Sequence, residues 1–320
     1  MIHNVALPDN TETDPRPAHL QQRVCVSSRV RVVALHVARR FIEARFAIDR
    51  YHRENAAEHR WSTTEPPVAM RIDSIAAALE QVLSPVGIET YPFKISWYNE
   101  RVPDVFKFPH HPDTLCFVAI STPSTFEKAF LPFILDNRNS SLKDPYDQCM
   151  TACFARVKQA FPDDVLEVIQ DFELHPNRRP KAIMQTAGHV AGAVHYYSCR
   201  GMHFDEELPP KKRLLGVSIH PRYGGWFAFR AVFIFRNVFV PELQRRQPVD
   251  VVRSDDQRTH LVRLFNFSWR DGRYRDIIDV EERYSARQQE YFNTLPGQRW
   301  QLIEKWRQEA SLCIQLNGCS

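Results

Sequence analysis

Trp226-Phe-Ala-Phe-Arg-Ala-Val-Phe-Ile-Phe235 carries the strongest fold signal in the chain. Apolar side chains stand at both sets of alternating positions, so a strand here needs other elements to cover both of its faces. The run from Thr114 to Thr122 is also nearly all apolar, which predicts a second strand in the middle of a sheet. The two runs together predict a central sheet flanked by helices.

The remaining elements follow from apolar spacing and from the turn residues between the apolar runs. Apolar residues from Ile72 to Leu83 repeat at helical spacing, and Asp144-Pro145 is typical of a helix start. Further strands are expected at 90–98, 165–174 and 214–220, and further helices after Pro123, over 181–197 and along the C-terminal part. This order predicts an α+β fold with a central antiparallel or mixed sheet, built as one domain over residues 70–310 and followed by a short tail, 311–320.

Residues 1–69 differ in composition from the rest of the chain. They are rich in Arg and contain no Lys, and they end in the polar stretch Trp61-Ser-Thr-Thr-Glu-Pro-Pro67. A mitochondrial presequence would be poor in acidic residues, whereas Asp and Glu recur throughout this stretch. We therefore expect a disordered or loosely helical extension.

The bulk composition excludes several classes of protein. No apolar run is long enough to cross a bilayer, so no membrane is expected, and a net charge of +4 without a basic stripe argues against nucleic acid. Seven cysteines at scattered spacings form no disulfide framework, which predicts a reducing compartment and hence the cytoplasm. An aromatic content of 12% is consistent with an apolar pocket for a planar ligand.

Arg230 is the most informative single residue, because it interrupts a strand that should be buried on both faces. A buried guanidinium carries a desolvation cost unless an anion meets it. The side chain could pair with a carboxylate of the protein, lie at the solvent end of the strand, or clamp a ligand carboxylate with its planar fork. Spacing alone leaves these alternatives open.

Two other arginines would not be singled out by their surroundings. Arg275 lies in Trp269-Arg-Asp-Gly-Arg-Tyr-Arg-Asp276, where charges of both signs are typical of a solvated surface. Arg299 lies in Pro296-Gly-Gln-Arg-Trp300, an ordinary helix start.

Histidine and glycine patterns give no metal or phosphate site. His189-Val-Ala-Gly192 is similar to the His-x-x-Gly element that ligates cobalt in some cobalamin enzymes, but the orienting Asp two residues earlier is replaced by Ala187. A packing or hydrogen-bonding histidine is favoured, and no protein metal ligand is assigned. Gly224-Gly225 is a tight connection between two strands, for which a hairpin turn is the simplest interpretation. No Gly-rich phosphate loop and no Cys-x-x-Cys pair occurs.

Several long segments, in one order, resemble the methylmalonic aciduria and homocystinuria type C family, also called CblC. The resemblance covers about residues 72–303 and rests on Tyr91-Pro-Phe-Lys-Ile-Ser-Trp-Tyr-Asn-Glu100, Asp144-Pro-Tyr-Asp-Gln-Cys149, His175-Pro-Asn-Arg-Arg-Pro-Lys181, His189-Val-Ala-Gly192, Ile219-His-Pro-Arg-Tyr-Gly-Gly-Trp-Phe-Ala228 and Asn266-Phe-Ser-Trp-Arg-Asp271.

The resemblance implies a flavin-nitroreductase-like fold and a cytoplasmic enzyme and chaperone that binds cobalamin in its base-off form. It implies two activities: cyanocobalamin reductase, with electrons from reduced flavin (FMN or FAD) or a thiol, and alkylcobalamin dealkylase, in which the glutathione thiolate is the nucleophile. No residue of the chain is then needed as acid or base. Two alternatives remain, namely a flavin reductase or nitroreductase and a non-catalytic cobalamin carrier.

By position, the resemblance also implies site residues and partners. Glutathione anchors fall on Arg230, Arg275 and Arg299. Cobalamin contacts fall on Asp171, Ala182, Ile183, Met184, Gln185, Tyr196, Tyr197, Ser198, Ser218 and Phe229, while His189, Gly192, Gly224 and Gly225 are candidate structural or pocket positions.

Three of these positions depart from the mammalian pattern of the family. Ser198, Ser218 and Phe229 stand where mammalian members have Gln, Cys and Ile. The loop 175–180 is exposed, basic and proline-fixed. The resemblance implies subunit contacts through it, and hence a ligand-promoted homodimer, while a solvated turn is the alternative. Implied protein partners are the adaptor protein of cobalamin trafficking (MMADHC-like) and methionine synthase with its reductase.

Overall fold

A computed structural model describes residues 68–136, 143–206 and 213–317. The prediction of a disordered or loosely helical extension falls almost wholly on residues outside the described part, and it stays a prediction. So does the domain division at 70–310, although helix α2 begins at Val68 and helix α9 ends at Asn317. Within the described part, no helix combines the length and the apolar character that crossing a membrane requires.

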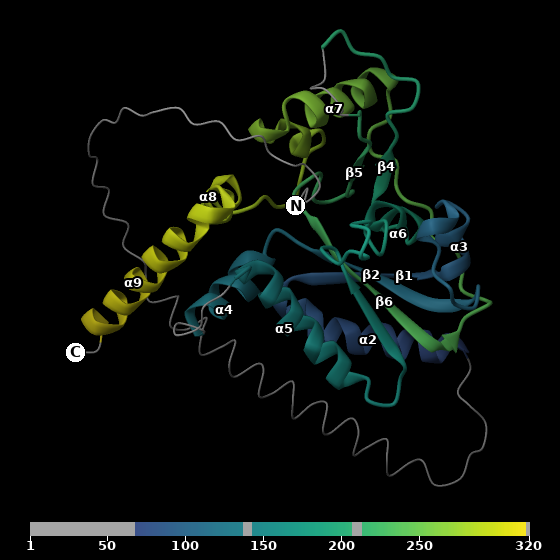
Figure 1. Ribbon diagram of the computed structural model, residues 1–320, viewed down its shortest axis with the longest axis horizontal. Coiled ribbons are helices and arrows are strands. Elements are labelled where there is room, and N and C mark those ends of the chain that lie inside the picture. Colours follow the sequence, from purple (N-terminus) through teal and green to yellow (C-terminus); the bar gives the residue numbers. More distant parts are fainter. Residues whose placement is uncertain (1–67, 137–142, 207–212, 318–320) are drawn as a thin grey trace.

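A four-stranded antiparallel sheet forms the centre of the molecule (Figure 1). Its strands lie in the order β1 (Ile88–Lys94), β2 (Thr114–Ser121), β6 (Ala228–Phe239) and β3 (Leu166–Gln170). The two apolar runs of the sequence are the two inner strands, β2 and β6, which pair along almost their whole length. The predicted α+β fold with a central antiparallel sheet is therefore confirmed.

Helices cover both faces of the inner strands, as the absence of polar alternation predicted. The odd-numbered positions of β2, 115–119, pack in one core with α2 (Val68–Leu83) and α5 (Pro145–Ala160). The even-numbered positions, 116–120, pack in a second core with α3 (Ile95–Asn99) and α6 (Met184–Val190). In Figure 1, α2 and α5 lie below the sheet and α3 and α6 above it.

A smaller layer stands above the second core. Strands β4 (His195–Tyr197) and β5 (Val217–Ile219) pair with each other and pack against α7 (Asp255–Phe267) through a third apolar cluster. The other helices are α4 (Leu131–Asp136), α8 (Ala286–Asn293) and α9 (Arg299–Asn317), with short turns at η1 (Ser84–Val86), η2 (Asp104–Phe106), η3 (Phe126–Phe130), η4 (Trp269–Asp271), η5 (Arg273–Asp276) and η6 (Pro296–Gln298).

The expected strands 165–174 and 214–220 are shorter than predicted, as β3 and β5, and two further elements differ in type over part of their length. The helix expected over 181–197 extends only over α6. Gly192 adopts a left-handed conformation (φ +72°) that ends the helix, and the chain then enters β4. The expected strand 90–98 changes to helix at Ile95, where the stacking of Tyr98 on Phe108, with ring centres 4.4 Å apart, outweighs the strand propensity of the aromatic residues.

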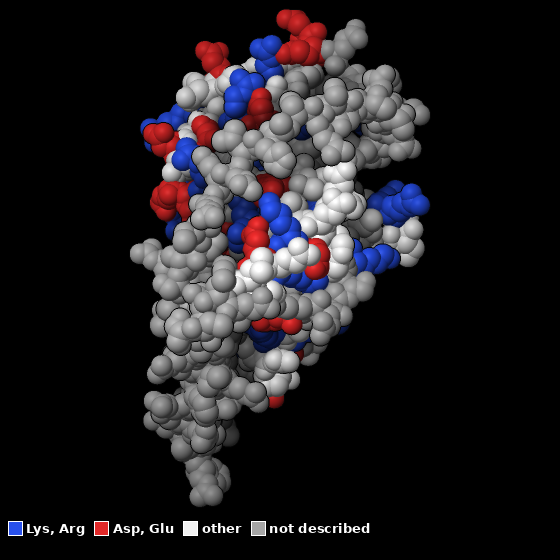
Figure 2. Space-filling model, turned by 90° about the vertical axis from the view of Figure 1, so that its left-hand side faces the viewer, with Lys and Arg blue, Asp and Glu red and all other residues white. Residues whose placement is uncertain are grey.

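Charges of both signs are interspersed over the described residues of the face in Figure 2. Exposed salt bridges such as Arg283–Asp276 and Arg273–Asp271 pair charges of opposite sign on the surface of the molecule as well. A surface of this kind has no single-sign field over the described residues of that face, in line with the small net charge.

Candidate functional site

Arg230 on β6 is buried, with 1% of its surface exposed. Its Nε donates a hydrogen bond of 2.9 Å to Oγ of Ser121, at the end of β2. Its Nη1 lies 3.6 Å from Oδ2 of Asp171, directly after β3, which is too long for a hydrogen bond. Its guanidinium carbon lies 4.6 Å from the ring centre of Tyr146. The flanking strands thus hold the arginine deep in the molecule without fully pairing it.

Two buried polar atoms at this point lack a hydrogen-bond partner among the described residues. They are Nη1 of Arg230 and the hydroxyl of Tyr146, which is itself fully buried. Leaving one buried donor unpaired costs about 1–3 kcal/mol, and native structures rarely contain two beside each other. An anionic ligand at this place can accept hydrogen bonds from both groups.

Arg275 lies among aromatic rings rather than on a solvated surface, because three rings enclose it. Its guanidinium carbon is 5.1–5.2 Å from the ring centres of Trp226, Tyr274 and Tyr284. Its Nη1 donates to the carbonyl oxygen of Gly225 at 2.6 Å. The expectation from alternating charges was therefore wrong, because apolar contacts from distant segments cover the side chain.

Arg299 does begin helix α9, as its sequence context indicated. Its Nε donates to the carbonyl oxygens of Tyr291 and Thr294, each at 3.1 Å. Its guanidinium carbon is 5.0 Å from the ring centre of Tyr291. These contacts turn the guanidinium back toward α8 instead of out to solvent.

One aromatic cluster joins the three arginines. We define it as Tyr146, Tyr284, Tyr291 and Phe292. Tyr146 lies 6.4 Å from Tyr291 and 5.4 Å from Phe292 between ring centres, and Tyr284 lies 5.9 Å from Phe292. Since each arginine contacts a different tyrosine of this cluster, three cations from distant parts of the sequence come together around it. We call this set the arginine cluster.

Acidic side chains lie at one side of the arginine cluster. Asp147 is in the first turn of α5, directly after Tyr146. Partial burial, together with the nearby carboxylates of Asp144 and Asp171, raises the pKa of Asp147 to about 7. The site therefore contains a carboxyl group that changes its charge near neutral pH.

Part of the predicted cobalamin set lines one cavity of about 290 Å³. Ile183, Gln185 and Tyr196 contribute to its wall, opposite Arg101 and Phe106. The cavity lies between the start of α6 and the loop after α3. Its volume is at the small end for ligand pockets, so it suits one ring system rather than a whole corrin.

The other predicted cobalamin residues are distributed around this cavity and the strands below it. Tyr197 donates to Asp250 at 2.8 Å, and its hydroxyl also accepts from two backbone amides, so its polar group is already used. Ser218 is buried on β5, opposite Tyr196, and its Oγ has no partner among the described residues. The remaining positions are buried Ala182, Met184 at the start of α6, exposed Ser198 after β4, half-buried Phe229 on β6, and Asp171 beside Arg230.

His189 and Gly192 belong to α6 and its end. Nδ1 of His189 accepts from the amide of Tyr196 at 3.2 Å, and the ring meets His195 edge to face. Burial and the nearby Arg101 lower the pKa of His189 to about 4, which keeps the ring neutral. Among the described residues, no three His, Cys, Asp or Glu side chains gather as metal ligands.

Gly224 closes a tight turn through an antiparallel bridge to His220, with backbone hydrogen bonds of 2.9 Å in both directions, although the strands on either side, β5 and β6, belong to different sheets. The turn also contacts Arg275: the amide of Gly225 donates to the Arg275 carbonyl oxygen at 3.0 Å, and Nη1 of Arg275 donates to the carbonyl oxygen of Gly225. Gly224 has φ +55°, and a Cβ there would lie 2.2 Å from the Arg275 carbonyl oxygen. Glycine is needed for this close approach.

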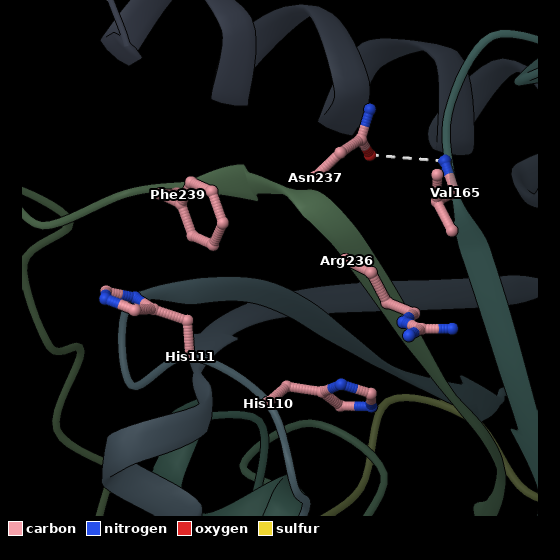
Figure 3. Close-up of a pocket in the computed structure, with 6 residues that line it drawn as sticks. All are labelled: His110, His111, Val165, Arg236, Asn237 and Phe239. Carbon is pink, nitrogen blue, oxygen red and sulfur yellow. Dashed lines mark hydrogen bonds between the residues drawn. The ribbon is translucent and has the colours of Figure 1, made fainter.

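A separate open depression of about 400 Å³ lies at the other end of β6 (Figure 3). His110, Arg236 and Phe239 line it. Nε2 of His110 lies 3.2 Å from a carboxylate oxygen of Glu167. Nine residues separate Phe239 from Arg230, which at the rise of a strand is roughly 30 Å, so this depression is distinct from the arginine cluster.

The sequence profile of the methylmalonic aciduria and homocystinuria type C family matches residues 87–303. The chain belongs to this family. A Gallus gallus protein named cyanocobalamin reductase / alkylcobalamin dealkylase is 47% identical over 233 residues, covering 72% of this chain and 96% of that protein. A Homo sapiens protein of the same name is 44% identical over 241 residues, covering 75% and 83%.

A solved structure of the family agrees with the fold. It is the crystal structure of a C. elegans B12-trafficking protein CblC, described as a human MMACHC homologue. It is 30% identical to this chain and superposes with a TM-score of 0.67, covering 74% of this chain and 97% of that one.

The aromatic cluster is the part of the site that sequence reasoning missed. Tyr146 stands in a segment that carries the family resemblance, but an aromatic residue in the first turn of a helix is usually a core residue. Tyr284 and Tyr291 come from the chain after α7, where no local pattern marks them. The one possible signal is the contact between a tyrosine and a buried arginine. Each tyrosine of the cluster is separated in the sequence from the arginine that it contacts, so the sequence does not show the contact.

Proposed function

We propose that the protein binds cobalamin base-off and removes its upper axial ligand, by glutathione-dependent dealkylation of alkylcobalamins and reductive decyanation of cyanocobalamin. Two groups of residues support this: the cavity at Ile183, Gln185 and Tyr196, and the arginine cluster. The chain's relatives carry both activities in their names. The observation that carries the thiol half of the proposal is the unpaired Nη1 of buried Arg230.

The arginine cluster suits a peptide thiol with more than one carboxylate. Glutathione is such a molecule, and Arg230, Arg275 and Arg299 provide planar forks for its carboxylates. Once the anionic ends are fixed, the thiol is held over the substrate and its attack becomes effectively intramolecular. In the reaction, the sulfur forms a bond to the alkyl carbon. The carbon–cobalt bond breaks with both electrons left on cobalt, and the thiol proton is released.

The predicted cobalamin contacts fit a bound corrinoid in a specific way. A cavity of about 290 Å³ is suited to the released benzimidazole base, while the larger corrin would extend across the neighbouring surface of α6, β4 and β5. Ser218 adds a buried hydroxyl without a partner among the described residues, which a corrin amide can satisfy. These contacts support Ile183, Gln185, Tyr196 and Ser218 as cobalamin-binding residues.

The decyanation half needs one electron per cobalamin, and a reduced flavin (FMN or FAD) or a thiol would supply it. We propose a flavin-nitroreductase-like fold on the same grounds, because a buried antiparallel sheet covered on both faces is compatible with it. A cytoplasmic location is proposed from the scattered cysteines, of which Cys116, Cys149, Cys153 and Cys199 are free thiols.

Partner proteins are proposed from the loop 175–180. Residues 175–179 are exposed, and the loop is closed by a bridge between Leu174 and Pro180 and by a bond of 2.8 Å from the amide of His175 to the carbonyl oxygen of Arg179. A fixed, protruding loop favours a protein contact, such as a ligand-promoted homodimer. Delivery of the product to an adaptor protein of cobalamin trafficking and to methionine synthase with its reductase completes the proposal.

Anaerobic absorption spectra of the protein with methylcobalamin, recorded before and after glutathione is added, test the function. We expect a shift to the base-off spectrum on binding, followed by conversion to reduced cobalamin only when glutathione is present. A base-off shift without conversion would indicate a carrier. If no shift occurs, the proposal is wrong, and titration with flavin would then test the reductase alternative.

A further inference from the structure

A polar network joins strand β1 to the turn that follows β5. The carboxylate of Glu89 accepts hydrogen bonds of 2.7 Å from the hydroxyls of Tyr91 and Tyr223. Nη2 of Arg222 donates to both of its oxygens, at 2.7 and 2.8 Å. Nε2 of His220, a residue that is 1% exposed, lies 3.1 Å from the Tyr91 hydroxyl. The network thus converges on one carboxylate.

The backbone of the turn fixes the tautomer of His220. The amides of Arg222 and Tyr223 donate to Nδ1 of His220, at 3.1 and 3.3 Å, so Nδ1 carries no proton. Burial lowers the pKa of His220 to about 4, and the ring is neutral near pH 7. Nε2 therefore carries the hydrogen and donates it to Tyr91, whose own hydroxyl donates to Glu89. Every bond along this line has a fixed direction.

The same turn determines where Arg275 lies. Gly225 exchanges two hydrogen bonds with Arg275, one through each backbone polar group. The amide of Glu281 donates to the carbonyl oxygen of Arg222 at 2.9 Å, which ties the following segment to the turn as well. Ring contacts alone allow a guanidinium to rotate in its plane. The bond from Nη1 to Gly225 sets that rotation, so a displaced turn also turns the fork of Arg275.

We propose that Glu89, Tyr91 and His220 are positioning residues for Arg275, and through it for a carboxylate of the thiol co-substrate. The inference rests on the proposed function for the identity of that anion. The path runs from Glu89 through Tyr91 and His220 to the turn, and from Gly225 to Arg275. Hydrogen bonds make the steps from Glu89 to the turn and from Gly225 to Arg275, and the backbone from Tyr223 to Gly225 connects them. None of Glu89, Tyr91 and His220 belongs to the arginine cluster or to the aromatic cluster.

Two substitutions interrupt the path at different points. Glu89→Gln removes the charge on which the donors converge, and Tyr91→Phe leaves Nε2 of His220 without its acceptor. For both variants we expect KM for glutathione in methylcobalamin dealkylation to rise about fivefold, while kcat changes less than twofold. The affinity for methylcobalamin, read from the base-off spectrum, should stay unchanged. If either variant does not fold, Tyr223→Phe removes one donor to Glu89 and keeps the ring.

Asp113→Asn is the matched control. Asp113 pairs with Lys94 at 3.0 Å, so this variant also removes a half-buried carboxylate from a salt bridge to β1, but at the end of the strand away from Glu89. We expect it to leave KM for glutathione unchanged. An equal rise in the control, or no rise in the Glu89 and Tyr91 variants, would mean that the network has no positioning role.

Hydrogen exchange provides a readout that needs no glutathione. The Glu89 and Tyr91 variants should speed amide exchange in the turn 220–225 and also in the segment 272–278, which neither substituted residue contacts directly. Faster exchange in both segments, in a protein that does not dealkylate with glutathione, would support the positioning role and contradict the proposed function. Faster exchange in the turn alone would contradict the positioning role, whatever the activity of the protein.

Discussion

The two ends of strand β6 each present an arginine, and they differ in how far the surrounding protein satisfies it. Arg230 is buried at one end, and its Nη1 has no hydrogen-bond partner within the described part of the chain, although the Asp171 carboxylate lies 3.6 Å away. Arg236 is exposed at the other end, beside a depression whose His110 is already paired with Glu167. A cation is thus common to both ends, but only Arg230 is buried with a donor that lacks a hydrogen-bond partner among the described residues. Burial with an unsatisfied donor, and not cavity volume, distinguishes the candidate binding site.

Neutralising one arginine at a time should give the largest difference in dealkylation activity between the two ends of β6. Arg230→Gln should lower kcat/KM for glutathione-dependent dealkylation by about a hundredfold, because truncating a buried charge contact costs about 2–5 kcal/mol. Arg236→Gln should change it less than twofold. Steady-state dealkylation rates, measured by the absorbance of cobalamin, test this prediction. Similar losses in both variants would remove the distinction between the two ends of β6.

Ser198 extends the comparison to the small sheet, where an exposed side chain follows β4. We propose that a small residue at this position leaves the reduced cobalamin more open to oxygen than a Gln would. We expect Ser198→Gln to lengthen the lifetime of the reduced product in air by about threefold, since a longer side chain can exclude water and oxygen from the metal. The decay of the reduced spectrum measures this, and an unchanged lifetime would refute it.

Tyr146 allows the unpaired donors to be tested one by one. Tyr146→Phe removes a buried hydroxyl without a partner in the described part of the chain, and it keeps the ring beneath Arg230. We expect the free energy of unfolding to rise by up to about 1 kcal/mol without ligand, because a desolvation penalty is removed. KM for glutathione should increase about threefold. Urea unfolding and kinetics check the two parts, and lower stability would indicate that the hydroxyl has a partner after all.

Substitution of Asp147 should give the smallest change in the free energy of unfolding, and this change depends on pH. The folded-state pKa of Asp147 is raised to about 7, so between the ordinary carboxyl pKa and 7 the folded state binds more protons than the unfolded state. This contribution to stability is present at low pH and is lost as the pH rises through 7. Asp147→Asn should therefore come closest to the native protein below the ordinary carboxyl pKa of 3.8, and should exceed its stability by a growing margin as the pH rises to 8. The gain should be under about 1 kcal/mol, because the carboxyl is only partly buried. Urea midpoints that differ equally at low pH and at pH 8 would contradict this assignment.

The sequence predicted those elements of the fold that depend on patterns of neighbouring residues. The inner strands β2 and β6 were identified by their apolar runs, and the start of α5 by Asp144-Pro145. The end of α6 at Gly192 was missed, because small residues continue the helical pattern and the left-handed turn becomes clear only in space. The strand marked Arg230 as a residue that could be buried, whereas the enclosure of Arg275 depends on Trp226 and Tyr284, which approach through tertiary packing. Long-range contacts of this kind leave no periodic signal.

The cysteines within the two cores have a practical consequence for work with thiols. Cys116 lies in β2, and Cys149 and Cys153 lie on α5, all three buried. Burial raises the pKa of Cys116 well above that of a free thiol, so it stays protonated and unreactive near pH 7. Cys199 is only half-buried. Among these four, an alkylating probe should label Cys199 first, so labelling of the other three reports opening of the cores rather than surface chemistry.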